Sequence, residues 1–310
     1  MNEIKPNNQK KLIGLDNYIN ELINLSKNDK LPNKILLSGL KGIGKSTLAY
    51  HLINFVLSQD DDFKYDEINF KINENNKTFK TIQNKSNPNF NLIDIKDDKK
   101  NIDINQIRKL ISNLNKSSFN NKLRFVLIDN VEYLNINSVN SLLKVIEEPN
   151  INIHFILINN NKKILPTLSS RCLNFKVSLT HHECLEISKK LLKDQLDDLI
   201  NEDLLDYYFT PGNLYKLVKF AENNNYNLMN VSLNDFLKLI IKDNQYKKDD
   251  SLKYLFFDLI EHYFRKINLT ITSNIYDKYS YFLKRISDTK TFNLDEESLF
   301  TEFEEEILDG

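Results

Sequence analysis

The chain has 310 residues, of which 41% are hydrophobic and 11% aromatic. Because a single hydrophobic core rarely grows past about 250 to 300 residues, this length predicts more than one domain, and the composition excludes disorder throughout. The 42 basic and 43 acidic side chains nearly cancel, which excludes a protein that coats nucleic acid or a membrane surface by its overall charge.

Targeting and metal signals are absent from the sequence pattern. No run approaches the about 18 apolar residues of a membrane span, and the start MNEIKPNNQKK has no apolar signal region, so we expect a cytoplasmic protein without membrane contacts. Cys172 and Cys184 are the only cysteines, too few for a four-ligand zinc site, and we expect no zinc. The chain has 37 lysines but only 5 arginines, so each arginine is more informative than usual.

The first predicted elements are a helix, a short strand and a second helix. Residues 12–33 carry apolar side chains at helical spacing. The apolar run KILLSG (34–39) indicates a strand, and STLAYHLINFVLS (46–58) returns to a helical period. Between them lies SGLKGIGKST, residues 38–47, which holds three of the six glycines in the chain.

Strands and helices then alternate. From 60 to 89 the sequence is rich in Asp, Asn and Lys, and its apolar residues define no face, which predicts a surface insertion or mobile loop. Strands are predicted over 90–96, 123–130 and 153–159. Helices are predicted over 103–115, with Asp103 as N-cap, and over 137–148, where Pro149 ends the helix. This alternation predicts a mostly parallel sheet with helices on both faces.

Helical spacing continues from Phe175 to the end of the chain. Helices are predicted over 185–196 and 211–222, and then over 232–243, 251–267 and 273–289. The acidic stretch LDEESLFTEFEEEILDG (294–310) has apolar residues at helical spacing and predicts a terminal amphipathic helix. We therefore expect an α/β domain over 1–175, a small helical domain over 176–226 and an all-helical domain over 227–310.

The glycine-rich stretch fits the phosphate-binding pattern G-x-x-x-x-G-K-[ST]. Glycines let backbone N–H groups turn inward around phosphate oxygens, the following helix N-terminus favours negative charge, and the lysine reaches the terminal phosphates. The serine hydroxyl would hold Mg²⁺. The residues predicted to bind ATP here are Gly39, Gly42, Gly44, Lys45, Ser46 and Thr47.

A nucleotide site also needs a carboxylate for its metal ion. The predicted strand FVLIDN ends in Asp129, and we predict that Asp129 and Ser46 hold Mg²⁺ through the nucleotide. An acid at a strand end can also be an ordinary turn residue. The glycine loop upstream favours the metal-binding interpretation.

After Asp129 the motifs follow a recognisable order: LLKVIEEP, a further strand, LPT and SRC, all within residues 127–172. This order resembles the clamp-loader branch of the AAA+ ATPases, most closely the delta-prime subunits of bacterial DNA polymerase III. The motifs cover residues 12–175, and beyond them the resemblance is one of architecture. It implies a RecA-like AAA+ P-loop domain, a helical lid and a helical collar that joins five subunits into a hetero-pentameric ring. Such rings place the sliding clamp on primed DNA.

The resemblance also assigns two further site residues. The arginine of SRC, here Arg171, would act as an arginine finger on the ATP of a neighbouring subunit. Its rigid charged fork can stabilise the charge of the transferred phosphoryl group. Asn159, at the end of the strand FILIN, occupies the family's sensor position near the nucleotide.

Two features depart from the pattern of active family members. The residue after the strand-end acid is Asn130 where a glutamate is expected, and an amide cannot act as a general base. Glu132 is an alternative base two residues on. The lid segment TPGNLYKLVKF offers Asn213 and no arginine, with Lys216 as a poorer substitute.

We therefore expect weak or no intrinsic ATPase activity, in a subunit that assists hydrolysis by its neighbour. Two alternatives remain open. One is a catalytically active clamp-loader ATPase of the tau/gamma type, for which the absence of cysteine in 60–89 is unfavourable. The other is an unrelated P-loop enzyme such as a small-molecule kinase.

Overall fold

The computed structural model describes residues 4–96, 99, 101–115, 122–147, 152–247, 250–267, 273–292 and 294–308. The chain divides into two compact units, residues 1–187 and 188–310, with the division inside helix α7 (His181–Leu191). The predicted separation of the second part into a lid and a collar stays a prediction. No described helix is long and apolar enough to cross a membrane.

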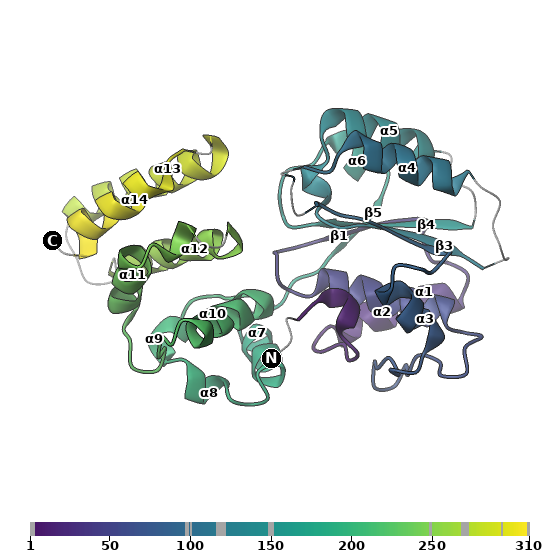
Figure 1. Cartoon of the computed structure of the whole chain (residues 1–310), viewed down its shortest axis with the longest axis horizontal. Coiled ribbons are helices and arrows are strands. Elements are labelled where there is room, and N and C mark those ends of the chain that lie inside the picture. The colour runs from purple at the N-terminus through teal and green to yellow at the C-terminus, as the bar shows by residue number, and fades with distance from the viewer. Residues whose placement is uncertain are drawn as a thin grey trace. The chain divides into compact units, whose positions relative to one another are not determined.

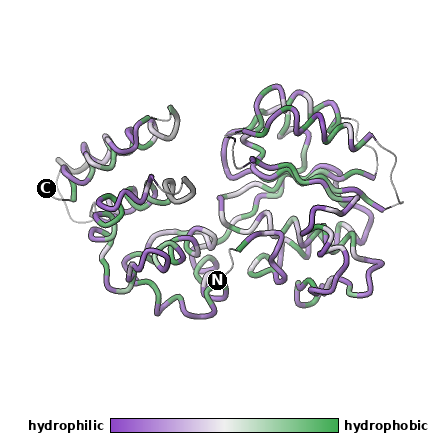
Figure 2. The backbone as a smooth tube through the Cα atoms, viewed as in Figure 1, coloured by the Kyte–Doolittle hydropathy of each residue, from purple (hydrophilic) through white to green (hydrophobic). Residues whose placement is uncertain are grey.

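Unit 1 is built on a five-stranded sheet with the order β2-β3-β4-β1-β5. The strands are β1 (Lys34–Ser38), β2 (Phe90–Ile93), β3 (Arg124–Ile128), β4 (Ile153–Asn159) and β5 (Leu173–Lys176). All pairings are parallel, and the register sets Ser38 between Asn159 and Lys176. Figure 2 shows these strands as a hydrophobic band through the unit, as expected when helices cover both faces.

Helices cover the sheet on both sides (Figure 1). One face carries α1 (Asp16–Lys27), α2 (Lys45–Leu57) and α3 (Lys77–Gln83), and the other carries α4 (Ile104–Leu114), α5 (Ile136–Glu147) and α6 (Pro166–Ser169). Two 3₁₀ turns are added, η1 (Pro6–Asn8) and η2 (Val131–Tyr133). The predicted parallel sheet between two helical layers is confirmed.

Local sequence signals explain how α4 and α5 are placed. Asp103 caps α4 in a capping box with Gln106, as the sequence predicts. Against β3 and β4, the two helices bury one continuous apolar cluster that includes Leu110, Leu142 and Ile146. Helix α5 is described to Glu147, and the proline predicted to end it lies outside the described residues.

The segment 60–89 is only partly the surface loop that the sequence predicts. It contains α3, capped by Asn76, whose side chain accepts hydrogen bonds from Phe79 N and from Asn54 of α2. Only two of its buried apolar residues lie on a helix, so they are hard to recognise in the sequence: the buried residues are Tyr65, Ile72, Phe79 and Ile82. Tyr65 and Asn76 of this segment contact α2, which α1 and η1 also cover, and α2 is buried almost all round.

The described elements of unit 2 are all helical. After α7 they are α8 (Leu196–Leu199), α9 (Glu202–Leu205), α10 (Pro211–Asn223), α11 (Leu233–Lys242), the turn η3 (Gln245–Lys247), α12 (Asp250–Ile267), α13 (Ser273–Phe292), α14 (Glu296–Phe303) and the π-helical turn η4 (Glu304–Leu308). Buried aromatic rings form much of the core, among them Phe256, Phe257, Phe264, Phe282, Phe300 and Phe303. The acidic terminal stretch is thus a helix that packs its apolar face.

Candidate functional site

The glycine loop joins β1 to α2 in a backbone conformation that its glycines make accessible. Gly39, Gly42 and Gly44 have φ values of 150°, 90° and 95°, a region that other residues rarely adopt. Gly39 N donates to Asn159 O at 3.2 Å. A Cβ atom at position 39 would lie 2.2 Å from Val177 O, so the loop also packs directly against the backbone that follows β5.

Lys45 begins α2 and turns its side chain back into the loop. Its Nζ donates to Gly39 O at 2.8 Å and to Leu40 O at 2.6 Å, and the residue is 3% exposed. Burial lowers the pKa of this ammonium to about 8, although nearby Asp129 and Glu132 oppose the shift. A buried cation in a glycine loop at a helix N-terminus is the arrangement that binds phosphate groups.

The loop meets the end of β3 through a direct contact. Ser46 Oγ donates to Asp129 Oδ2 at 2.6 Å, joining residues 83 positions apart in the chain. Burial is the main cause that raises the pKa of Asp129 to about 6, and the hydrogen bond from Ser46 opposes it. The next predicted residue of the loop, Thr47, is half-buried on α2. The structure therefore brings the two predicted metal ligands together beside the buried lysine.

This donor set fits Mg²⁺. A serine hydroxyl and a carboxylate are hard oxygen ligands, and Mg²⁺ is commonly bound by one or two such groups together with phosphates of the substrate. Among the described residues, no group of three or more His, Cys, Asp or Glu side chains could hold a metal ion without such help.

Beyond Asp129 lies a network of amides and carboxylates. Asn130 adopts a left-handed conformation with φ 57° and donates from Nδ2 to Asp94 Oδ1 at 2.8 Å. Its Oδ1 accepts from Asn160 Nδ2 at 2.8 Å. Asn160 also donates to both carboxylate oxygens of Glu132, from Nδ2 at 2.9 Å and from its backbone N at 3.3 Å. Asn130 and Glu132 are thus held by the same asparagine.

Asn159 ends β4 with its side chain engaged in the following turn. Its Nδ2 donates to Lys162 O at 2.9 Å, and its Oδ1 accepts from Lys162 N at 3.0 Å. Its contact with the glycine loop is made by the backbone oxygen. The predicted sensor role stays a prediction.

Arg171 lies at the surface, where α6 leads into β5. Its Nη1 donates to Thr167 O at 2.8 Å, and its Nη2 forms an ion pair with Glu147 Oε1, also at 2.8 Å. The side chain is 37% exposed. Asn213 and Lys216, considered for the lid, are on α10 in unit 2.

Sequence reasoning missed three residues of this region: Asp94, Asn160 and Glu147. A signal for Asp94 is present in the sequence, because it follows β2 as Asp129 follows β3, and parallel neighbouring strands end at the same edge of a sheet. Asn160 and Glu147 carry no comparable signal. Their contacts depend on how turns and helix ends meet in three dimensions.

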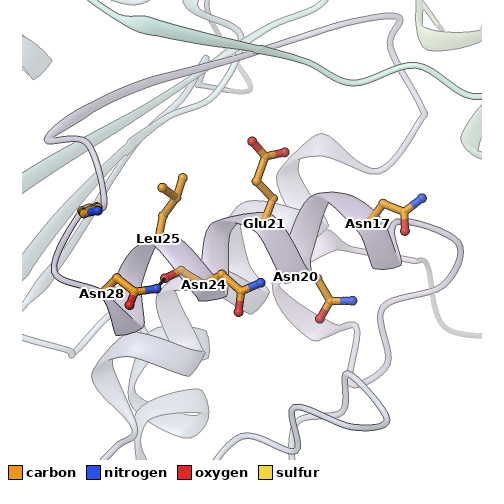
Figure 3. Close-up of a pocket in the computed structure, with 7 residues that line it drawn as sticks. Asn17, Asn20, Glu21, Asn24, Leu25 and Asn28 are labelled. Carbon is orange, nitrogen blue, oxygen red and sulfur yellow. Dashed lines mark hydrogen bonds between the residues drawn. The ribbon is translucent and has the colours of Figure 1, made fainter.

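A surface hollow of about 440 Å³ follows α1 (Figure 3). Amide side chains dominate its lining, which consists of Asn17, Asn20, Glu21, Asn24, Leu25, Asn28 and Lys30. None of the predicted site residues lines it, so it is separate from the candidate nucleotide site.

Comparisons with known proteins agree with the fold. A family model described as "DNA polymerase III, delta subunit" matches residues 14–181, more than half of the chain. Among solved structures, a DNA polymerase III gamma subunit-related protein from Thermotoga maritima is similar, with 17% identity and a TM-score of 0.50, over 90% of this chain and 96% of its own. No curated protein matches the sequence.

Two further Thermotoga maritima structures are similar. The RuvB Holliday junction branch migration motor matches with 17% identity and a TM-score of 0.43, over 78% of this chain and 81% of its own. Domain III of the replication initiation protein DnaA matches with 15% identity and a TM-score of 0.42, over 77% and 95%. The predicted fold, a RecA-like AAA+ domain followed by a helical region, is confirmed.

Proposed function

The chain belongs to the DNA polymerase III delta-subunit family of clamp-loader proteins, and from this premise we propose that it is the delta-prime-type subunit of a bacterial clamp loader. In this role it joins the other subunits in a hetero-pentameric ring that loads the sliding clamp onto primed DNA. It assists ATP hydrolysis in the ring more than it performs it.

Nucleotide binding by the chain itself is supported by the loop geometry. The phosphates of ATP would replace the loop carbonyls as partners of Lys45, and the N–H groups at the start of α2 would face the same anion. Ser46 and Asp129 would hold Mg²⁺ against the phosphates. When bound, the metal ion would neutralise phosphate charge.

One observation carries the proposal of weak hydrolysis. The position after the strand-end acid is occupied by the amide of Asn130, which donates to Asp94 and accepts from Asn160. Attack on ATP requires a group that orients and deprotonates water. Asn130 offers no such group, and both ends of its amide are already engaged.

Arg171 supports a contribution to the neighbour. The guanidinium is at the surface, and its two described contacts are to residues of its own chain, which leaves part of its five N–H groups for a phosphate outside the chain. We propose that it acts in trans on the ATP of the adjoining subunit.

The test is ATP binding and turnover by the purified chain. We expect the wild type to bind ATP and to hydrolyse it slowly, and we expect Lys45→Ala to weaken binding about a hundredfold because the buried ammonium is lost. Lys41→Ala, a change of an exposed lysine in the same loop, is the matched control and should bind nearly as the wild type. Rapid turnover by the lone chain that Lys45→Ala abolishes would contradict the proposal.

A second candidate function is a fully active ATPase of the tau/gamma type. It is favoured by Glu132, whose carboxylate is near enough to Lys45 to counteract, after Asp129, part of the lowering of the lysine pKa that burial causes. If Glu132 were the base, Glu132→Gln would abolish turnover by the lone chain. In the delta-prime-type proposal this change alters the slow turnover little.

A further inference from the structure

We propose that Glu147 is a positioning residue for Arg171, holding its guanidinium ready for the nucleotide of the adjoining subunit before the ring assembles. This inference rests on the trans-acting role proposed above. It adds a residue that the sequence motifs do not connect with that role.

The first part of the arrangement is a helix cap. Helix α6 is a single turn, and the carbonyl groups in the last turn of a helix need partners from outside it. Arg171 Nη1 supplies one by donating to Thr167 O at 2.8 Å, four residues earlier in the chain. One nitrogen of the guanidinium is therefore fixed by the local backbone.

The second part comes from a different helix. Glu147 is the last described residue of α5, and its Oε1 lies 2.8 Å from Arg171 Nη2. Two contacts, to two different nitrogens, restrict both the position and the rotation of the planar guanidinium group. A single contact would leave the long side chain free to rotate about it.

The two anchors are held at a constant separation by a shared core. Ile146, next to Glu147, and Leu168, next to Thr167, are almost completely buried and belong to the same apolar cluster between α5, α6 and the sheet. Because close-packed interiors deform little, this cluster fixes the end of α5 relative to α6. The carboxylate and the carbonyl therefore meet the guanidinium in a preset geometry.

The exposure of the Arg171–Glu147 ion pair indicates that Glu147 positions the guanidinium and does not withhold it from a ligand. The side chains of Arg171 and Glu147 are 37% and 49% exposed, and ion pairs of this kind add little to folding stability. A phosphate of higher charge can therefore compete for or share the guanidinium. The ion pair restricts the rotamers of Arg171 in advance. Without it, the arginine would lose this conformational freedom only when it binds the phosphate.

The experiment measures steady-state ATP hydrolysis by the complex reconstituted from the full-length chain and its partner subunits. Glu147→Ala should lower kcat about fivefold and leave KM for ATP unchanged, because the nucleotide is bound by another subunit. Glu147→Gln keeps an oxygen acceptor, and should retain about half of the wild-type kcat. Glu74→Ala removes another exposed carboxylate of unit 1, paired with Lys10, and should have no effect.

A double-mutant cycle separates this role from a general structural one. If Glu147 acts only through Arg171, Glu147→Ala should cause no further loss in an Arg171→Ala background. Suppose that Arg171→Ala by itself lowers kcat. The inference about Glu147 is then overturned, and the trans-acting role is not, by an additional loss in that background or by an unchanged kcat for Glu147→Ala. An increased kcat for Glu147→Ala also overturns it, because it would show that Glu147 withholds the guanidinium. If Arg171→Ala has no effect on hydrolysis, the proposed trans-acting role fails, and the inference fails with it.

Discussion

The polar residues of α2 and the Arg171 region differ in how their charged or hydrogen-bonding groups are surrounded. Lys45, His51 and Asn54 on α2 are at most 3% exposed and bind groups of their own chain. The Arg171 side chain, between α6 and β5, is 37% exposed. The comparison teaches that the lysine suited to a ligand of this chain is enclosed together with its polar neighbours on α2, whereas the group proposed to act on another chain is presented outward.

The enclosed groups also show the effect of burial on their protonation. Burial lowers the pKa of Lys45 to about 8 and that of His51 to about 4. His51 Nε2 faces Gln9 O, which can only accept, so Nε2 carries the proton and Nδ1 accepts from the hydroxyl of Tyr65. The histidine is therefore a neutral connector between the start of the chain, α2 and the segment 60–89.

The largest expected effect concerns the exposed group of the comparison, Arg171. Arg171→Ala should reduce hydrolysis at the adjoining site of the reconstituted complex by about a thousandfold, because a trans-acting guanidinium stabilises the charge of the transferred phosphoryl group. ATP binding by the purified chain should be unchanged. Radiolabelled phosphate release by the complex and nucleotide titration of the lone chain measure the two quantities.

Two variants control this experiment. Arg171→Lys should restore little activity, since a point charge cannot reproduce the planar fork. Lys144→Ala removes an exposed cation from α5 and should leave hydrolysis near the wild-type rate. A complex that assembles with Arg171→Ala and hydrolyses ATP normally would disprove the outward role.

A smaller effect, on folding stability, is expected from His51, one of the enclosed groups of α2. Because its pKa is about 4 in the folded chain and near 6.5 when unfolded, the unfolded state binds an extra proton between these values. Folding stability from this group is present above pH 6.5 and falls as the pH drops toward 4, by about 3 kcal/mol. Urea unfolding of the wild type at several pH values measures it.

The variant His51→Gln isolates the contribution of this one histidine. It should lower the free energy of unfolding at neutral pH, because its amide cannot pack as the ring does, but the loss of stability between pH 6.5 and 4 should become smaller by about 3 kcal/mol. His181→Gln changes a partly exposed histidine and serves as control. An equal acid sensitivity in His51→Gln and the wild type would rule out a buried neutral His51.

The smallest expected effect concerns Asn130 and tests whether a missing general base limits ATP hydrolysis by this chain. Asn130→Glu places a carboxylate after the strand-end acid and should raise ATP turnover of the lone chain about tenfold, since a general base becomes available. The gain is limited because Asp94 accepts from this position now and would repel a second carboxylate. Asn130→Gln should give no gain. An unchanged rate for Asn130→Glu would show that something other than the missing base limits turnover.

Most of the fold of unit 1 could be predicted from the sequence because its strands are apolar runs and its helices have a regular period. Asp103 even marks the start of α4 with its cap. The segment 60–89 could not be predicted to the same extent. Tyr65 is buried against His51 and Phe55 of α2, and this depends on tertiary packing that no local pattern records.

The candidate site divides in the same way. The pairing of Ser46 with Asp129 follows from a linear motif and a strand end, and both are visible in the sequence. The ties of Asn130 to Asp94 and of Arg171 to Glu147 join separate turns and helix ends, so they require the coordinates. Sequence motifs identify which groups are present, and the structure adds which of them are already engaged.

The close approach of Gly39 to Val177 links the two regions mechanically. Strand β5 lies next to β1 and begins two residues after Arg171, and no side chain can be accommodated between the loop and the carbonyl oxygen of Val177, which follows the strand. A ligand that moves the loop at Gly39 toward Val177 must therefore also move the backbone after β5, because there is no space between them. If the loop binds phosphate as proposed, backbone contact alone connects that site with the strand that leads back to Arg171.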